Sequence, residues 1–441
     1  MNDSSDSSAQ QSADTAPVPE QPSPASPAAA GPPTASRRGG ILEAFENRSF
    51  RFQWPADGLT IWAFEMETLV LGWYILNATD SPALVGLIGT LRFGGTLFGP
   101  LYGALTDKFN RRTLLIVDRA VLTGIALGFT SLALSGGLEP WHAFVFAFLT
   151  GIARNLDNVV RQALMADVIP ARTLSNALAL SRGVMDISRI MGALLGGSLL
   201  SALGVGEAYV AVMLLYAGSS ILSLGIVLKK QTMKVDDSGW LANLKEGVSY
   251  MRHDQSILGP LVLAFLVNLT LFPVVNGLMP VVAREIYHKG PNGLAMMQMA
   301  PGIGALIGSV WLAAYAQSAA PMRRMMIGIV LWHVSMLVFA FMGWWLAALV
   351  TLVVYGTTQS VAMISMASTL LHASPVEYRG RVMGVRSLAV YGLPMGLLIS
   401  GVIAELFGIR LALAINSIVG LVGTAIAALI WREMWAKPGR G

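Results

Sequence analysis

The strongest constraint in the sequence is a series of about twelve apolar stretches, each of roughly 20 residues, separated by short polar breaks. A helix of that length crosses the hydrocarbon core of a membrane, where only helices and closed barrels satisfy the backbone. Composition agrees, because 54% of the 441 residues are hydrophobic and 12% are charged, about half the charged share of a soluble protein. The sequence therefore predicts an all-α integral membrane protein and excludes a soluble enzyme.

The apolar stretches divide into two groups of six. The expected spans of the first group are 55–77, 83–105, 113–135, 141–166, 174–203 and 207–229. Those of the second group are 258–283, 293–316, 321–343, 345–371, 382–406 and 410–432. We expect six-helix bundles over 41–229 and 258–433, a disordered cytoplasmic tail at 1–40, a cytoplasmic linker at 230–257 and a short cytoplasmic tail at 434–441.

The distribution of Lys and Arg predicts the orientation. With the N-terminus inside, twenty of these residues fall on one side of the membrane, and Arg284, Lys289 and Arg410 fall on the other. Because basic residues collect on the cytoplasmic side, we expect a multi-pass protein of the plasma (inner) membrane with both termini in the cytoplasm. The same asymmetry explains the net charge of +5 without a nucleic-acid partner.

The two halves of the chain resemble each other. The segments VIPARTLSNALALSRG and ASPVEYRGRVMGVRSL align at an offset of 205, which pairs Pro170 with Pro375 and Gly196 with Gly401. A duplicated six-helix unit with a site at the interface between its copies is the usual plan of a transporter.

The break after the second expected span reads GALTDKFNRR from Gly103 to Arg112. It resembles the signature loop of the major facilitator superfamily, Gly-x-Leu-x-Asp-Arg/Lys-x-Gly-Arg-Arg/Lys, and departs from it at Asn110, which replaces the second glycine. Asn still tolerates the left-handed backbone that a tight turn needs. We expect close helix contact at the glycine and a charge-and-dipole latch at the acid and the bases. The latch residues are Gly103, Asp107, Lys108, Arg111 and Arg112.

Further stretches are similar to the branch of that superfamily that holds the enterobactin exporter and related drug exporters. They are FRFQW at 50–54, the residues WY and TDSP between 73 and 82, and PVEYRGRVMG at 375–384. The resemblance covers about residues 48–433. Exporters of this superfamily often carry Gly-Pro-x-x-Gly-Gly in the fifth span, which here reads GALLGG at 192–197, with Ala193 in place of Pro. The glycines still allow tight packing.

The resemblance implies a twelve-helix secondary transporter, with two six-helix bundles that rock about a site near the middle of the membrane. It favours proton-driven export of a small organic molecule such as a drug or siderophore. The implied partners are that molecule, protons and the lipid bilayer, and the fold would work as a monomer. We expect no enzyme activity, cofactor or metal, because the chain has no Cys and no Gly-Lys-Ser/Thr phosphate loop, and its five His are scattered.

Placing an ionisable side chain inside a span costs on the order of a few kcal/mol, so each such residue is a functional candidate by default. The acids proposed for proton coupling are Glu65, Glu67, Asp157 and Asp186. Glu65 and Glu67 lie roughly 200° apart around a helix, so they cannot both face one cavity. We favour Glu65 or Asp157 as the carboxylate that alternates between its protonated and ionised forms.

Arginines accompany these acids. Arg154, Asp157 and Arg161 share one helix face, and Arg182, Asp186 and Arg189 share another. The sequence leaves open whether these stripes are structural ion pairs or contact the substrate and protons directly. With Arg92 the five arginines exceed the four acids by one, which leans toward an anionic or zwitterionic substrate. The substrate-binding candidates are Arg92, Arg154, Arg182, Arg189, Asn268, Asn276, Gln298, Gln359 and Arg386.

Other functions remain open at this point. The same fold can serve an importer or a lysolipid flippase, and a degenerate transporter can act as a scaffold or sensor. A membrane enzyme that handles lipids is a further class, for which the sequence offers no catalytic constellation.

Overall fold

A computed structural model describes residues 41–228, 255–315, 321–375 and 379–431. Within these ranges every regular element is helical. The predicted tails at 1–40 and 434–441 and nearly all of the predicted linker at 230–257 lie outside the described residues.

The described helices follow the expected spans closely. The first half contains η1 (Ile41–Glu46), α1 (Arg48–Thr79), α2 (Pro82–Gly94), η2 (Gly95–Phe98), α3 (Gly99–Lys108), α4 (Arg111–Leu134), α5 (Pro140–Val168), α6 (Ala171–Leu203) and α7 (Val205–Ser223). The second half contains α9 (Gln255–Thr270), η3 (Val274–Leu278), α10 (Met279–Val281), η4 (Val282–Ile286), α11 (Pro291–Tyr315), α12 (Pro321–Phe341), α13 (Trp345–Ala373), α14 (Arg379–Leu388), η6 (Ala389–Tyr391), α15 (Gly392–Phe407) and α16 (Ile409–Ile430).

Eleven of the helical segments in the described ranges are long and apolar enough to cross a membrane. A twelfth span is formed if Pro82–Phe98 and Leu101–Lys108, which meet at 52°, are taken together. The bend follows from the sequence GGTLFGP at 94–100, because glycines and a proline interrupt the regular ladder of backbone hydrogen bonds. These segments match the twelve spans expected from hydropathy.

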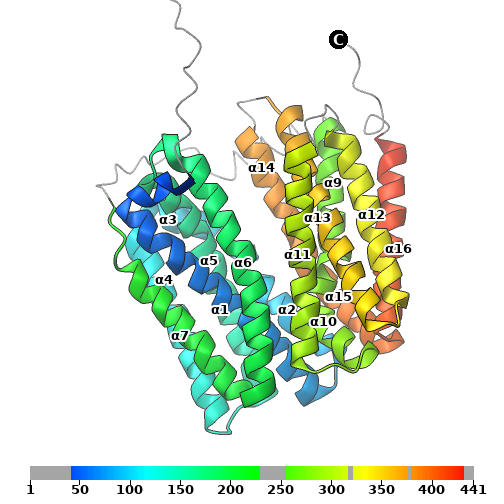
Figure 1. The fold of residues 1–441 in the computed structure, drawn as a ribbon, viewed down its shortest axis with the longest axis horizontal. Coiled ribbons are helices and arrows are strands. Elements are labelled where there is room, and N and C mark those ends of the chain that lie inside the picture. The colour runs from blue at the N-terminus through cyan, green and yellow to red at the C-terminus, as the bar shows by residue number, and fades with distance from the viewer. Residues whose placement is uncertain (1–40, 229–254, 316–320, 376–378, 432–441) are drawn as a thin grey trace, which may run out of the picture. The chain divides into compact units, whose positions relative to one another are not determined.

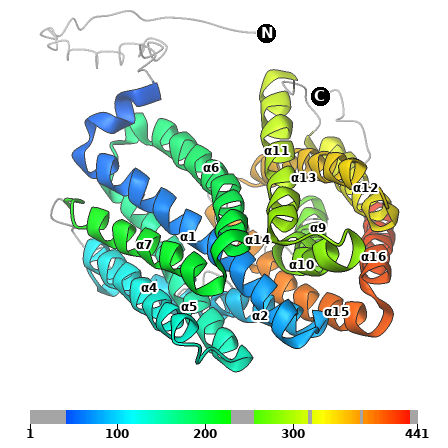
Figure 2. The same ribbon diagram turned by 60° about the horizontal axis from the view of Figure 1, so that its bottom comes forward.

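The helices form two groups, α1–α7 and α9–α16 (Figures 1 and 2). Helix α1 begins and α16 ends at the same end of these groups (Figure 1), which we call the terminal end. We call the opposite end the far end. Helix α2 lies against α15, and α6 lies against α11.

The two crossings between the groups use small residues at positions of the two halves that differ by one residue from exact equivalence in the internal repeat. On α15, a Cβ added at Gly401 would lie 3.1 Å from atoms of Gly86 and Pro82 and 3.3 Å from Ala83, all on α2. On α6, a Cβ added at Gly197 would meet Ala295 at 2.5 Å and Pro291 at 2.7 Å on α11. The tight packing expected of the glycines in GALLGG is therefore present. The pairing also follows the internal repeat, since the fifth span of one half meets the second span of the other in both cases.

Polar contacts at the far end join the ends of first-half helices to side chains of the second half. The carboxylate of Glu405 accepts hydrogen bonds from Ser81 Oγ at 2.8 Å and Ala83 N at 3.1 Å, at the start of α2. Arg284 donates to Leu76 O at 2.9 Å and pairs with Asp80 at 2.9 Å, at the end of α1. A carboxylate thus lies at a helix N-terminus and a guanidinium lies at a helix C-terminus. In both cases the charge interacts favourably with the helix dipole. We call this set the far-end seal.

Three glycines toward the terminal end lack the close contacts that are found at the crossings. A Cβ added at Gly103 on α3, Gly183 on α6 or Gly384 on α14 would meet no described atom within 4 Å. The described contacts between the halves therefore concentrate from the far end to the middle of the helices.

We expect the double substitution Glu405→Gln and Arg284→Gln to let the halves part at the far end, because it removes the two charges that the second half contributes to the seal. A reporter is available in Ser201 and Asn292, whose side chains lie 3.3 Å apart across the other crossing. The chain has no Cys, so cysteines at these two positions can be cross-linked without background. Cross-linking should slow several-fold.

Gly124→Leu serves as a control, since an added Cβ there meets nothing within 4 Å. An unchanged cross-linking rate in the double variant would show that the seal does not hold the halves together.

Candidate functional site

The centre of the first half is a network of buried charges around Arg119 of α4. Its guanidinium donates to Asp57 of α1, to Asp157 of α5 at 2.8 Å and to Ser223 of α7 at 2.8 Å. Arg119 and Asp157 are 0% exposed and Asp57 is 1% exposed. A buried guanidinium has to be paired and hydrogen-bonded, since it loses its water. Arg119 therefore ties four helices together.

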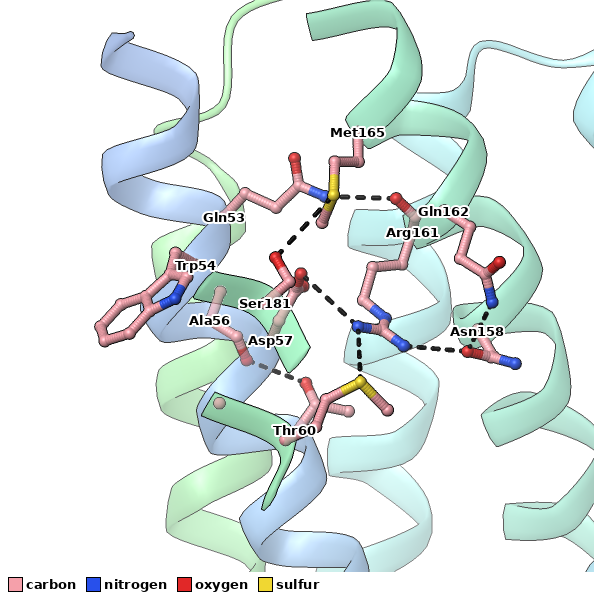
Figure 3. Close-up of polar contacts among 12 residues, drawn as sticks. Gln53, Trp54, Ala56, Asp57, Thr60, Asn158, Arg161, Gln162, Met165 and Ser181 are labelled. Atoms are coloured by element: carbon pink, nitrogen blue, oxygen red, sulfur yellow. Dashed lines mark hydrogen bonds and ion pairs between the residues drawn. The ribbon is translucent and has the colours of Figure 1, made fainter. Parts of the chain in front are cut away.

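Two more arginines complete this network. Arg154 pairs with Asp157 at 3.3 Å, and Arg161 lies 4.0 Å from carboxylate oxygens of both Asp57 and Asp157. Figure 3 shows Arg161 between Asp57 on one side and Asn158 on the other, and Asn158 accepts a hydrogen bond from it at 2.9 Å. The predicted stripe on α5 thus faces into the first half.

Three charged residues of this region were not singled out from the sequence, namely Asp57, Asp118 and Arg119. All of them lie inside expected spans, at 55–77 and 113–135, so the rule that selected Asp157 applies equally to them. Asp118 is 5% exposed and makes no ion pair with a described residue, and its Oδ2 atom has no hydrogen-bond partner.

These residues change the charge count. Inside the expected spans, leaving aside Glu207 and Lys229 at the two ends of the sixth, the first half has six acids and six arginines, namely Asp57, Glu65, Glu67, Asp118, Asp157 and Asp186 against Arg92, Arg119, Arg154, Arg161, Arg182 and Arg189. The excess of one positive charge predicted from the sequence is therefore wrong, and the sum is zero. The count by itself does not favour an anionic substrate.

Glu65 and Glu67 face different neighbours. Glu67 is 1% exposed, and its two carboxylate oxygens accept hydrogen bonds from Tyr209 and Tyr216 of α7, both at 2.9 Å. Glu65 pairs with Arg189 of α6 at 3.2 Å, and these two side chains are 21% and 50% exposed. Glu65 thus belongs to an accessible ion pair, whereas Glu67 lies inside the first half.

The remaining pair on α6 is local. Asp186 pairs with Arg182 of the same helix at 3.4 Å, and the Arg182 side chain is 68% exposed. Among the described residues no ion pair joins α5 to α6.

A small pocket lies between the two halves and brings together three of the predicted substrate-binding residues. Arg92 of α2 reaches it from the first half, and Asn276 of η3 and Gln298 of α11 reach it from the second. Thr68 of α1 adds a hydroxyl, and the other lining residues are glycine or apolar. The pocket has room for about one water molecule.

The other candidates of the second half lie apart from this pocket. The amide of Asn268 donates to Ala264 O of its own helix at 2.8 Å, and the residue is 7% exposed. Gln359 of α13 and Arg386 of α14 are half-buried and do not line the pocket. Arg386 makes no ion pair with a described residue.

The latch loop has a stronger ion pair than the one expected. Arg111 lies 3.7 Å from Asp107, whose side chain is 68% exposed, but it donates to both carboxylate oxygens of Asp167 on α5 at 2.9 and 2.8 Å. Arg112 donates to Leu224 O at 2.9 Å, and Lys108 lies 5.9 Å from the ring of Phe109.

Two expectations about this loop are wrong in the structure described. Gly103 makes no close helix contact, because an added Cβ would meet no described atom within 4 Å. Asn110 has φ −63° and is not left-handed; it is the N-cap of α4, where its side chain accepts from the backbone of Arg112 and Thr113. Asn suits this position for its capping oxygen.

A family model described as "Major Facilitator Superfamily" matches residues 58–395, which is more than half of the chain. The chain belongs to the Major Facilitator Superfamily. It is therefore a multi-pass membrane transporter and not an enzyme, as the signature loop predicted. Twelve spans in two six-helix bundles are the fold expected of a member of this superfamily.

Curated members of the superfamily are similar along most of their length. Macrolide efflux protein A of Streptococcus pyogenes is 21% identical over 374 residues, which cover 81% of this chain and 91% of that protein. Enterobactin exporter EntS of Salmonella typhimurium is 23% identical over 346 residues, which cover 76% and 81%. The predicted resemblance to the enterobactin-exporter branch is thus confirmed.

A solved structure shows the same fold at low identity. It is a bacterial homologue of the human lysosomal transporter Spinster, in an inward-facing and unoccupied conformation, with a TM-score of 0.67 and 12% identity. The match covers 90% of this chain and 100% of that one.

We expect Asp157→Asn to destabilise the protein strongly, because it leaves Arg119 and Arg154 without their shared carboxylate. Breaking a buried pair from one side costs about 3–5 kcal/mol. Asp186→Asn is the matched control, since its partner Arg182 is 68% exposed and exposed pairs contribute about 0–1 kcal/mol. Thermal unfolding in detergent should show a much lower Tm for Asp157→Asn only. Equal Tm values for the two variants would contradict a structural role of the network.

Proposed function

We propose that the protein is a secondary active exporter of a small organic molecule, driven by protons and working by alternating access. Its similarity to efflux proteins supports export as the direction. The observation that carries proton coupling is the accessible ion pair of Glu65 and Arg189, which joins α1 to α6 within the spans.

The arrangement of the halves supports alternating access. Described contacts between them concentrate between the far end and the middle of the helices, and a Cβ added at Gly103, Gly183 or Gly384 toward the terminal end would meet no described atom within 4 Å. With both termini in the cytoplasm, as the Lys and Arg distribution predicts, this is a conformation open toward the cytoplasm. A molecule to be exported enters from that side. Because the pocket lies between halves of one chain, a monomer in the plasma (inner) membrane suffices.

The partners of each acid favour Glu65 over Asp157 as the proton carrier. Protonation of Asp157 would remove the shared partner of two buried arginines, which is costly. Protonation of Glu65 leaves only Arg189, which is 50% exposed and can be solvated. The predicted roles of Glu67 and Asp186 remain proposals of the same kind, and Glu67 would have to take its proton from inside the first half.

We expect Glu65→Gln to abolish substrate-linked proton movement and to leave the Tm near that of the unmodified protein. The assay uses proteoliposomes with an imposed pH gradient, a pH-sensitive dye inside, and a panel of siderophores, dyes, antibiotics and lysolipids. The matched control is Glu207→Gln, in the first turn of α7, which should keep coupled transport.

Coupled transport that survives in Glu65→Gln would sink the assignment of Glu65. Substrate movement without proton movement in the unmodified protein would sink proton coupling itself. Movement of no compound at all would favour a scaffold or sensor, and movement of lysolipids alone would favour a flippase.

A further inference from the structure

We propose that Arg92, Gln298 and Asn276 form a binding site for a carboxylate or other oxyanion group on the transported molecule. This rests on the proposed transport function and adds the chemical class of the substrate. The site uses the pocket between the halves, with the cation supplied by the first half and two amides supplied by the second.

Arg92 is a buried cation without an acidic partner among the described residues. Its residue is 5% exposed, its Nη2 atom donates to Phe64 O at 3.1 Å, and its Nε atom has no hydrogen-bond partner. A guanidinium has five N–H donors in a planar fork that fits two oxygens at once. Most of these donors are therefore available to a ligand in the pocket that the side chain lines.

Neighbouring charges do not neutralise Arg92 by direct contact. Arg92 and Arg154 both lie against the ring of Phe64, with guanidinium carbons 4.3 and 4.9 Å from its centroid. Arg154 has Asp157 as its partner, and Glu67 is hydrogen-bonded to two tyrosines of α7. Arg92 is thus a buried arginine for which no described side chain supplies the counter-anion, so an anionic group of a ligand could take that place.

The second half contributes matching donors. Gln298 makes no side-chain hydrogen bond with a described residue, so both of its amide protons are available. The amide of Asn276 donates one hydrogen bond to Phe272 O at 2.9 Å and keeps a second N–H. Asn276 lies on η3, a π-helical turn, and such turns occur often at functional sites.

The size of the pocket limits what it can hold. Room for about one water molecule suits one oxygen of an oxyanion and not a whole drug or siderophore. The body of the molecule then has to lie outside the pocket. Because donors come from both halves, an oxyanion here would bridge them, which links binding to their relative movement.

The test uses matched pairs of compounds that differ only in charge, each a carboxylate-bearing dye, siderophore or antibiotic and its methyl ester. Binding to the purified protein is measured by ligand-induced thermal stabilisation and by calorimetry, independently of transport. For the unmodified protein we expect acids of the panel to bind more tightly than their esters. In Arg92→Gln that advantage should fall by about tenfold or more, as expected for the loss of a charge-assisted hydrogen bond.

Three further variants keep the test sharp. Arg92→Lys should retain part of the advantage, because it keeps the charge and loses the planar fork. Gln298→Leu should reduce it without touching the buried charge of the first half. Arg410→Gln removes a cation at the start of α16, where it donates to Ala340 O, and should leave the advantage unchanged.

Acids and esters that bind equally to the unmodified protein would overturn the proposal, and so would an advantage that persists in Arg92→Gln. Transport of esters as fast as acids, coupled to protons, would refute this substrate class and leave the proposed function intact. Preferential binding of acids without transport of any compound would support the oxyanion site and refute the proposed transport function.

Discussion

The first half of the protein depends on the guanidinium of Arg119, which lies where four helices meet. Its bonds to Asp57, Asp157 and Ser223 set the relative positions of α1, α4, α5 and α7, because each donor direction is fixed by the planar group. The second half is held differently. Its centre is apolar, with Trp332 and Tyr355 fully buried, and its buried His333 bonds to Thr270 and Ile329 O. Buried ion pairs therefore stabilise the first half, and apolar packing stabilises the centre of the second.

Among the described residues, buried ion pairs lie within the first half, and none joins the two halves. The crossings are built on glycine and alanine, so the helices approach closely without interlocking large side chains. The polar contacts of the far-end seal involve exposed groups, such as Asp80 with a side chain that is 83% exposed, and exposed pairs are weak. A first half tied together by buried ion pairs, and joined to the second by close-packed small residues and exposed polar pairs, can move as one body. Alternating access needs that combination.

Hydropathy predicted the twelve spans because the thickness of the membrane sets the length of each apolar stretch, and that length can be read directly from the sequence. The signature loop likewise predicted the superfamily, although the backbone of Asn110 and the open space at Gly103 differ from what its consensus suggests. Pairing could not be predicted. Asp157 pairs with Arg119, a residue 38 positions away on another helix. The sequence of a span does not indicate which other helix its side chains will face. The same holds for Arg92, Asn276 and Gln298, which were predicted one by one and come together only because α2, η3 and α11 border the same pocket.

The most direct test of this account is a set of spin-label distances in lipid nanodiscs, measured before and after the far-end seal is removed. One pair of labels at Val121 and Val145, both exposed on α4 and α5, reports on the first half alone. Pairs at Leu203 with Leu406 and at Leu178 with Ile327 report on the far and terminal ends between the halves. The account predicts that the far-end distance lengthens, the terminal-end distance shortens and the distance within the first half stays constant. A change within the first half, or movement of both ends in the same direction, would contradict it.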